Sequence, residues 1–193
     1  MPAPRTVGDF LRRGADQFTI RTSLLEKRFI FGDEALAEKM RKRLRADLFD
    51  GTERDFIEAK LEERDARHEK QGKRYMVEPH VKEGKGGLRD LQSLFWIAKY
   101  LHRVDTAAEL VTHGMFTEEE FATFATAESF LWAVRCHLHL VTGRPSEQLT
   151  FDLQVEVADR MRYADSAGRR AVEHFMQDYF RHATAVGDLT RIF

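Results

Sequence analysis

The sequence predicts a mostly α-helical protein, a helical bundle with one short β element near residues 74–82. Two observations carry this prediction. Apolar residues recur at helical spacing along nearly the whole chain. Only the stretch YMVEPHVK at residues 75–82 alternates apolar and polar side chains, as a strand with one polar face does. Pro79 cannot donate a hydrogen bond to a neighbouring strand, so this element is expected at a sheet edge.

The N-terminal half is predicted to form amphipathic helices. Four helical stretches are expected, each beginning at a capping residue or ending near a glycine: residues 6–11, 20–33, 34–49 and 53–70. The last stretch carries few apolar and many charged residues, so it must be largely exposed or face a polar cleft.

The C-terminal half is predicted to be a helical bundle. Its helical stretches are residues 88–101, 107–112, 117–142, 152–161 and 166–189. Thr117 and Glu120 form a capping box, and Pro145 forbids continuation of the long stretch beyond Gly143. The pair His137 and His139 is not a zinc site, because residues two apart on a helix point about 200° apart.

Composition and charge narrow the class of protein. The chain has 193 residues, 42% hydrophobic and 33% charged, as a soluble, helix-rich globular protein has. Its net charge of −1 provides no overall field for nucleic acid, so any anion must be bound locally. Cys136 is the only cysteine, which excludes an intrachain disulfide and fits a reducing compartment. No apolar run approaches the about 20 residues of a membrane span, so we expect a cytoplasmic protein without membrane contact.

The segment Gly84-Lys85-Gly86-Gly87 is the strongest functional signal. It connects the predicted strand to the helix that begins at Leu88. Glycine allows a positive φ and a close backbone approach, and free N–H groups at a helix start suit a phosphate or carboxylate. Lys82, Lys85 and Arg89 would surround that anion, together with the backbone of Gly86 and Gly87. The pattern matches neither GxxxxGK[ST] nor GxGxxG, so a plain connecting turn with solvated lysines is the alternative.

Four stretches resemble one family of enzymes. EPHVKEGKGGLRD at residues 78–90 resembles the segment EP(N/D)(V/I)K-x-x-x-GGLRD of the bifunctional uridylyltransferase/uridylyl-removing enzymes, which modify the bacterial PII nitrogen-signalling protein. Similar matches are TSLLEKRFIFGD at residues 22–33, RDFIEAKLEERDARH at 54–68, and FLWAVRCHLHLVTGR with LTFDLQ within 130–154. Because the motifs occur in the family's order, the resemblance covers nearly the whole chain.

The resemblance implies a function and a domain organisation. The chain would be a segment of a nucleotidyltransferase that transfers UMP from UTP to the PII protein, with Mg²⁺ in the complete enzyme. Residues 1–84 would end the nucleotidyltransferase-like lobe, and residues 85–193 would form a helical bundle domain. The family's Asp-x-Asp metal-binding pair is absent from the sequence, and so is the His-Asp dipeptide of its hydrolytic domain. We therefore expect the segment to be incomplete for catalysis.

The resemblance also implies site residues. Lys82 and Arg89 match the family pattern and are expected to contact phosphate or to shape the cleft. His80 stands where relatives have Asp or Asn, so Glu78 is the remaining candidate for a third carboxylate, and Glu78 and His80 are the metal candidates. Arg89 and Asp90 can instead simply pair with neighbouring helices. Two other functions stay open: a non-catalytic protein-interaction module with a purely structural glycine turn, and an independent nucleotide- or phosphate-binding regulator.

Overall fold

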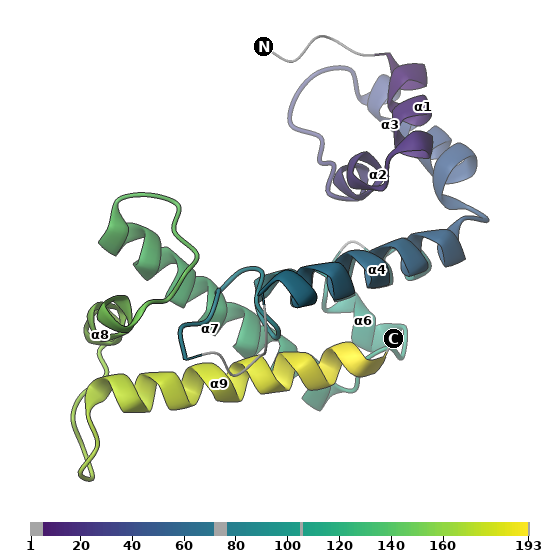
Figure 1. Ribbon diagram of the computed structural model, residues 1–193. Helices are drawn as coiled ribbons and strands as arrows, with labels where there is room; N and C mark the ends of the chain where they lie inside the picture. The colour runs from purple at the N-terminus through teal and green to yellow at the C-terminus, as the bar shows by residue number, and fades with distance from the viewer. Residues whose placement is uncertain (1–5, 72–76, 105, 193) are drawn as a thin grey trace. The chain divides into compact units, whose positions relative to one another are not determined.

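The structure is a computed structural model that describes residues 6–71, 77–104 and 106–192 (Figure 1). The helices are α1 (Val7–Asp16), α2 (Phe18–Leu25), α3 (Glu34–Leu44), α4 (Glu53–Gln71), α5 (Leu88–His102), α6 (Glu109–Thr112), α7 (Glu118–Thr142), α8 (Phe151–Arg160) and α9 (Ala171–Leu189). A π-helical turn, η1 (Arg45–Phe49), continues α3, and a 3₁₀ turn, η2 (Thr190–Ile192), follows α9. The mostly α fold class predicted from the sequence is confirmed.

Within the described residues, the predicted β element consists of a single β-bridge. Residues 74–76 lie outside the described residues. In the described remainder, His80 forms an isolated antiparallel bridge with Gln148, and the chain turns from residue 81 onward. The alternation of residues 75–82 predicts one buried apolar face, but Val81 is fully buried whereas Val77 is 63% exposed. The Gly84 N–H donates to the His80 carbonyl at 2.8 Å, and this tight reversal prevents an extended strand.

The chain divides into two compact units. Unit 1 comprises Met1–Glu62 and Trp96–Asp105, and unit 2 comprises Glu63–Phe95 and Thr106–Phe193. Helices α4 and α5 therefore each contribute residues to both units. The domains predicted at 1–84 and 85–193 rest on the resemblance to a longer enzyme and stay a prediction.

Unit 1 is built around Tyr100. The Phe56 ring stacks on the Tyr100 ring with 4.0 Å between centroids, and both side chains are fully buried. The Tyr100 hydroxyl lies 2.7 Å from the Thr52 hydroxyl and donates to the Leu48 carbonyl at 3.2 Å. The buried polar tip is thus satisfied, as a buried tyrosine requires.

Unit 2 is built around α7. The buried part of its apolar stripe includes Phe124, Leu131 and Leu138. Helices α7, α8 and α9 lie beside one another (Figure 1). The predicted capping box is confirmed, since the Thr117 hydroxyl accepts from the Glu120 N–H at 3.1 Å and the Glu120 carboxylate accepts from the Thr117 N–H at 2.8 Å. No helix among the described residues has the length and apolar character needed to cross a membrane.

Candidate functional site

The turn that contains the predicted site residues is anchored by the segment after α7. The Leu149 N–H donates to the Pro79 carbonyl at 2.9 Å, and the Val81 N–H donates to the Glu147 carbonyl at 2.8 Å. These long-range hydrogen bonds fix the residues before the glycines to a second chain segment. The fully buried Val81 side chain further stabilises this contact. The turn at residues 80–87 is therefore a fixed part of unit 2.

The glycines are required by close backbone contacts. Gly86 has a φ of +74°, and a Cβ there would lie 2.0 Å from the Ala183 carbonyl oxygen on α9. At Gly87 a Cβ would lie 2.6 Å from the Val81 carbonyl oxygen. Both distances are far below van der Waals contact, so no side chain fits. The predicted positive φ and close backbone approach are confirmed at Gly86.

The first backbone N–H groups of α5 have partners inside the turn. Leu88, Arg89 and Asp90 donate to the carbonyls of Val81, Lys82 and Gly87 at 3.1, 2.9 and 3.0 Å. The Gly86 N–H donates to the Asp90 carboxylate at 2.8 Å. An anion at this turn would therefore be held by side chains rather than by the N-terminus of α5. The sequence alone did not predict these hydrogen bonds, because the positions of the accepting carbonyls depend on the conformation of the turn.

Asp90 joins the glycine turn to α4. Its carboxylate is 1% exposed and lies 2.5 Å from Arg67 Nη2, while His68 Nε2 lies 2.9 and 3.0 Å from the two carboxylate oxygens. Burial alone raises the pKa of Asp90, but the hydrogen bonds from His68 and Gly86 and the charge of Arg67 together lower it below its ordinary value. Asp90 thus pairs with Arg67 and His68 of a neighbouring helix, α4.

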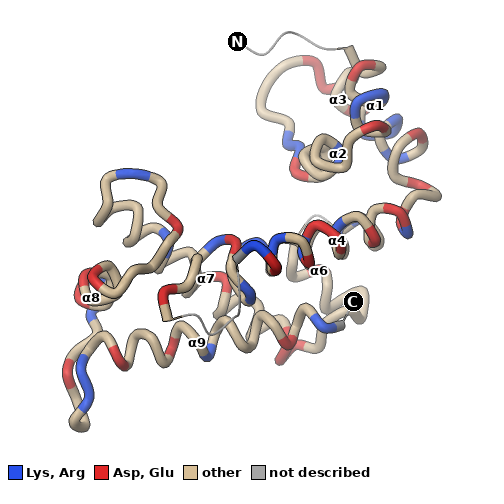
Figure 2. Tube along the Cα trace, viewed as in Figure 1, with Lys and Arg blue, Asp and Glu red and all other residues tan. Residues whose placement is uncertain are grey.

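Glu83 is surrounded by three cations. Its carboxylate oxygens lie 3.7 Å from Lys82 Nζ, 3.6 Å from Arg89 Nε and 3.7 Å from Arg67 Nε. We call Arg67, Lys82 and Arg89 the cationic cluster. Two of its members, Lys82 and Arg89, were predicted as phosphate contacts, and Lys85 lies half-buried in the same turn. Arg67 was missed because it lies on α4, where acidic and basic residues follow one another closely (Figure 2).

Glu78 and His80 are engaged in holding the backbone. Glu78 Oε1 accepts the Phe151 N–H at 2.8 Å, so it caps the first turn of α8. His80 Nδ1 accepts the Glu83 N–H at 3.0 Å, and burial lowers the pKa of His80, which favours the neutral imidazole that this bond requires.

Glu78 and His80 are the metal-ligand candidates of the sequence. Among the described residues, no group of three or more His, Cys, Asp or Glu side chains is arranged to hold a metal ion. Mg²⁺ also prefers oxygen ligands to imidazole. A role of Glu78 as a third carboxylate, or of His80 as a metal ligand, stays a prediction.

A half-buried ion pair between Arg135 on α7 and Glu147 in the following segment supports the same turn. Arg135 Nε lies 2.9 and 3.0 Å from the two Glu147 carboxylate oxygens, and Arg135 Nη2 lies 2.6 Å from one of them. Burial raises the pKa of Glu147, but its hydrogen bonds with Arg135 and that residue's charge lower it below the ordinary value. The Glu147 carbonyl also accepts the Val81 N–H, so the ion pair links α7 to the turn.

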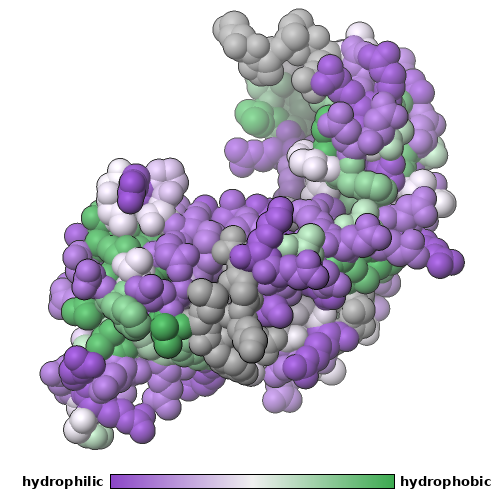
Figure 3. Space-filling model, viewed as in Figure 1, coloured by the Kyte–Doolittle hydropathy of each residue, from purple (hydrophilic) through white to green (hydrophobic). Residues whose placement is uncertain are grey.

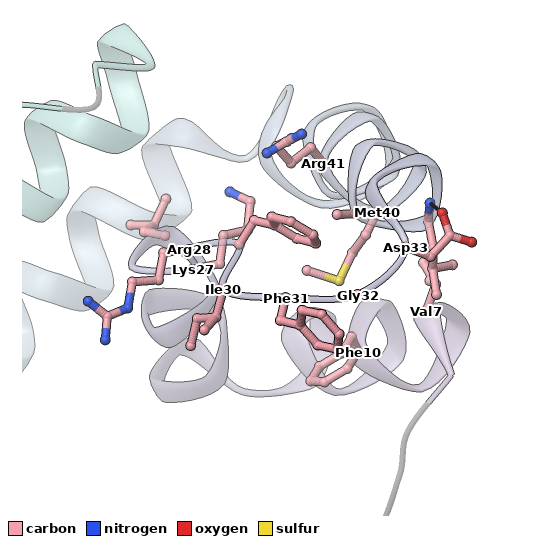
Figure 4. A pocket seen from close by; sticks show the side chains of 14 residues that line it. Val7, Phe10, Lys27, Arg28, Ile30, Phe31, Gly32, Asp33, Met40 and Arg41 are labelled. Atoms are coloured by element: carbon pink, nitrogen blue, oxygen red, sulfur yellow. Dashed lines mark hydrogen bonds between the residues drawn. The ribbon is translucent and has the colours of Figure 1, made fainter.

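Unit 1 has an open apolar groove of about 690 Å³ between α1, α3 and residues 27–33 (Figure 4). Helix α2 ends at Leu25, not near Gly32 as predicted. Phe31 and Ile30 therefore lie beyond the helix and are 95% and 80% exposed. Phe10, Phe31 and Met40 are among the residues that line the groove, and Lys27, Arg28 and Arg41 add basic side chains to its lining (Figure 4).

Unit 2 has a smaller apolar groove beside α8 and the start of α9, with a volume of about 420 Å³. Phe151 and Val155 on α8 line it and are 57% and 56% exposed. Figure 3 shows a hydrophobic area over this part of the surface. The groove contains no member of the cationic cluster.

Comparisons with known proteins identify the family. The profile of the GlnD PII-uridylyltransferase family matches residues 55–193. Similar proteins include the bifunctional uridylyltransferase/uridylyl-removing enzymes of Ruegeria pomeroyi (68% identical over 189 residues), Cereibacter sphaeroides (64% over 190) and Erythrobacter litoralis (56% over 190), each match covering 98% of this chain. The chain spans only 20–21% of the length of these relatives. No solved structure shows a significant match. The chain thus belongs to the GlnD PII-uridylyltransferase family.

Proposed function

We propose that this chain is the part of a PII uridylyltransferase that contacts the phosphates of UTP while UMP is transferred to the PII protein. The observation that carries the proposal is the convergence of Lys82, Arg89 and Arg67 on one carboxylate. Basic side chains that already gather around a carboxylate are suited to a phosphate group. Lys85 extends the positive charge of the turn, while Gly86 and Gly87 give the turn its shape.

The proposed role divides the chemistry between this chain and the rest of a longer enzyme. Nucleotidyl transfer needs carboxylates that hold Mg²⁺ and positive groups that position and neutralise the triphosphate. This chain supplies positive groups but has no Asp-x-Asp pair. We therefore assign Mg²⁺ binding to the complete enzyme and expect the 193-residue chain alone not to transfer UMP.

A second candidate function is that of a protein-interaction module. The groove of unit 1, with Phe31 and Ile30 exposed at its edge, favours it. The occupant we assign is an apolar segment from the rest of a longer polypeptide, because the chain spans only 20–21% of the length of its relatives. In that case the glycine turn is purely structural, and nucleotide binding is not expected.

Mg-UTP binding separates the two functions. We expect saturable binding in a calorimetric titration, weakened about 10- to 100-fold by Lys82→Ala and by Arg89→Ala, since each removes a charged hydrogen-bond donor to phosphate. Arg181→Ala is the matched control, because Arg181 is 71% exposed on α9 and should leave the affinity unchanged. Circular dichroism checks that each variant is folded. Lack of saturable binding, or equal affinity in all variants, would contradict the phosphate role and favour the interaction module.

A further inference from the structure

The position of Glu83 is unusual for a structural ion pair. Its carboxylate lies among the three members of the cationic cluster, yet the distances of 3.6 and 3.7 Å exceed the length of a hydrogen bond. By contrast, the Asp90 carboxylate lies 2.5 Å from Arg67 and 2.9 Å from His68. Glu83 is therefore near three cations without being tightly bound through any of these contacts.

The Arg67 guanidinium lies beside Glu83 and has one N–H group without a hydrogen-bond partner among the described residues. Its side chain is only 8% exposed, and Nη2 is bound by Asp90. Its Nε is buried and has no hydrogen-bond partner among the described residues, while Glu83 Oε2 lies 3.7 Å away. A buried polar donor without a partner costs about 1–3 kcal/mol. An anionic oxygen that came closer than Glu83 does would therefore gain a hydrogen bond from Arg67.

The Glu83 side chain can rotate away from the cationic cluster while its main chain stays in place. The Glu83 N–H is held by His80 Nδ1 at 3.0 Å, so the main chain is fixed. The side chains of Lys82, Glu83 and Arg89 are 31%, 27% and 23% exposed, so the cluster is reachable from solvent. A rotation of the glutamate side chain would move its carboxylate away from the cationic cluster, while the hydrogen bond to His80 holds the main chain of the turn.

We propose that Arg67, Lys82 and Arg89 form a phosphate site and that Glu83 competes with the phosphate for these cations. The ligand class is a phosphate group of a polyphosphate, which carries more negative charge than one carboxylate and offers several acceptor oxygens. Arg67 contributes Nε, while Asp90 keeps its Nη2 in place. The inference rests on the proposed phosphate role of the cationic cluster, to which it adds Arg67 Nε as a specific donor and Glu83 as a competing anion.

The test is a calorimetric titration of the whole chain and its variants with tripolyphosphate, with UTP and with inorganic phosphate. Glu83→Gln removes the competing charge with little change of shape, so we expect about 5- to 100-fold tighter binding of tripolyphosphate. Glu69→Gln is the matched control, since it removes the same charge from an exposed position on α4 and should change the affinity by less than about twofold. In the Lys82→Ala background the gain from Glu83→Gln should be smaller, because one of the competed cations is absent.

The outcomes distinguish this inference from the function on which it rests. Unchanged or weaker tripolyphosphate binding by Glu83→Gln overturns the competition, even if Lys82→Ala still weakens UTP binding and so upholds the phosphate role. If Glu83→Gln binds tripolyphosphate more tightly, but UTP binds no more tightly than tripolyphosphate, the phosphate site is upheld and its use for a nucleotide is contradicted. Inorganic phosphate that saturates the site as tightly as tripolyphosphate identifies the ligand as a single phosphate group.

Discussion

Gly86→Ala is expected to lower the free energy of unfolding of the chain by about 3–5 kcal/mol. Two effects add. The added Cβ would lie 2.0 Å from the Ala183 carbonyl oxygen and 2.9 Å from the Ala183 Cα, which are backbone atoms of α9 and cannot rotate away. The φ of +74° also costs a residue with a side chain about 1–2 kcal/mol. Urea denaturation followed by circular dichroism measures the loss.

Gly114→Ala separates the two effects. Gly114 has a φ of +69°, close to that of Gly86, but a Cβ there meets nothing within 4 Å. This control keeps the backbone strain and removes the collision, so its expected loss is about 1 kcal/mol. Similar losses in both variants would show that Gly86 is not held tightly against α9.

Asp90→Ala is expected to destabilise the chain by about 3–5 kcal/mol, because it leaves buried Arg67 without its carboxylate. It also removes the acceptor of the Gly86 N–H. Asp65→Ala is the control, since the Asp65 side chain is 67% exposed and pairs with the neighbouring Arg64. Its expected effect is at most about 1 kcal/mol. An equally small loss for Asp90→Ala would mean that the contact with α4 contributes little to stability.

The same carboxylate gives the stability a pH dependence with a defined sign. The pKa of Asp90 is lower in the folded chain than its ordinary value, so its stabilisation is complete above about pH 4 and is lost as the pH falls through the folded value. The difference in unfolding free energy between the wild type and Asp90→Asn should therefore shrink on acidification. A difference that stays constant between about pH 6 and about pH 2 would contradict this.

Local patterns in the sequence predicted most of the helices, although α2 ends at Leu25 and not near Gly32. The Thr117 and Glu120 capping box and the buried stripe of α7 depend on residues three and four apart, which a sequence displays directly. In the described residues, the predicted β element before the glycines is present as the bridge between His80 and Gln148. Its alternation described only a few residues, whereas the reversal at Gly84 and the bond from Val81 to the distant Glu147 decide the conformation there.

The candidate site was only partly visible in the sequence. Lys82 and Arg89 were found because they belong to a recognisable motif around the glycines. Arg67 was not, because it lies 23 residues before Asp90 in the chain and is one of many charged residues on α4. The one available signal was the excess of charge on that helix, which predicted either exposure or a polar cleft. Glu83 carried no signal, since its importance comes from the three cations that surround it.

UMP transfer by a complete enzyme tests the central claim most directly. This chain should replace the matching segment of the Ruegeria pomeroyi relative, which is 68% identical over 189 residues, and the mass of PII should be measured after incubation with Mg²⁺ and UTP. The unaltered relative is the positive control. We expect the chimera to add a uridylyl mass to PII, and Lys82→Ala or Arg89→Ala within it to raise the KM for UTP about tenfold or more. An active chimera whose kinetics both substitutions leave unchanged would contradict the claim that this chain contacts the phosphates.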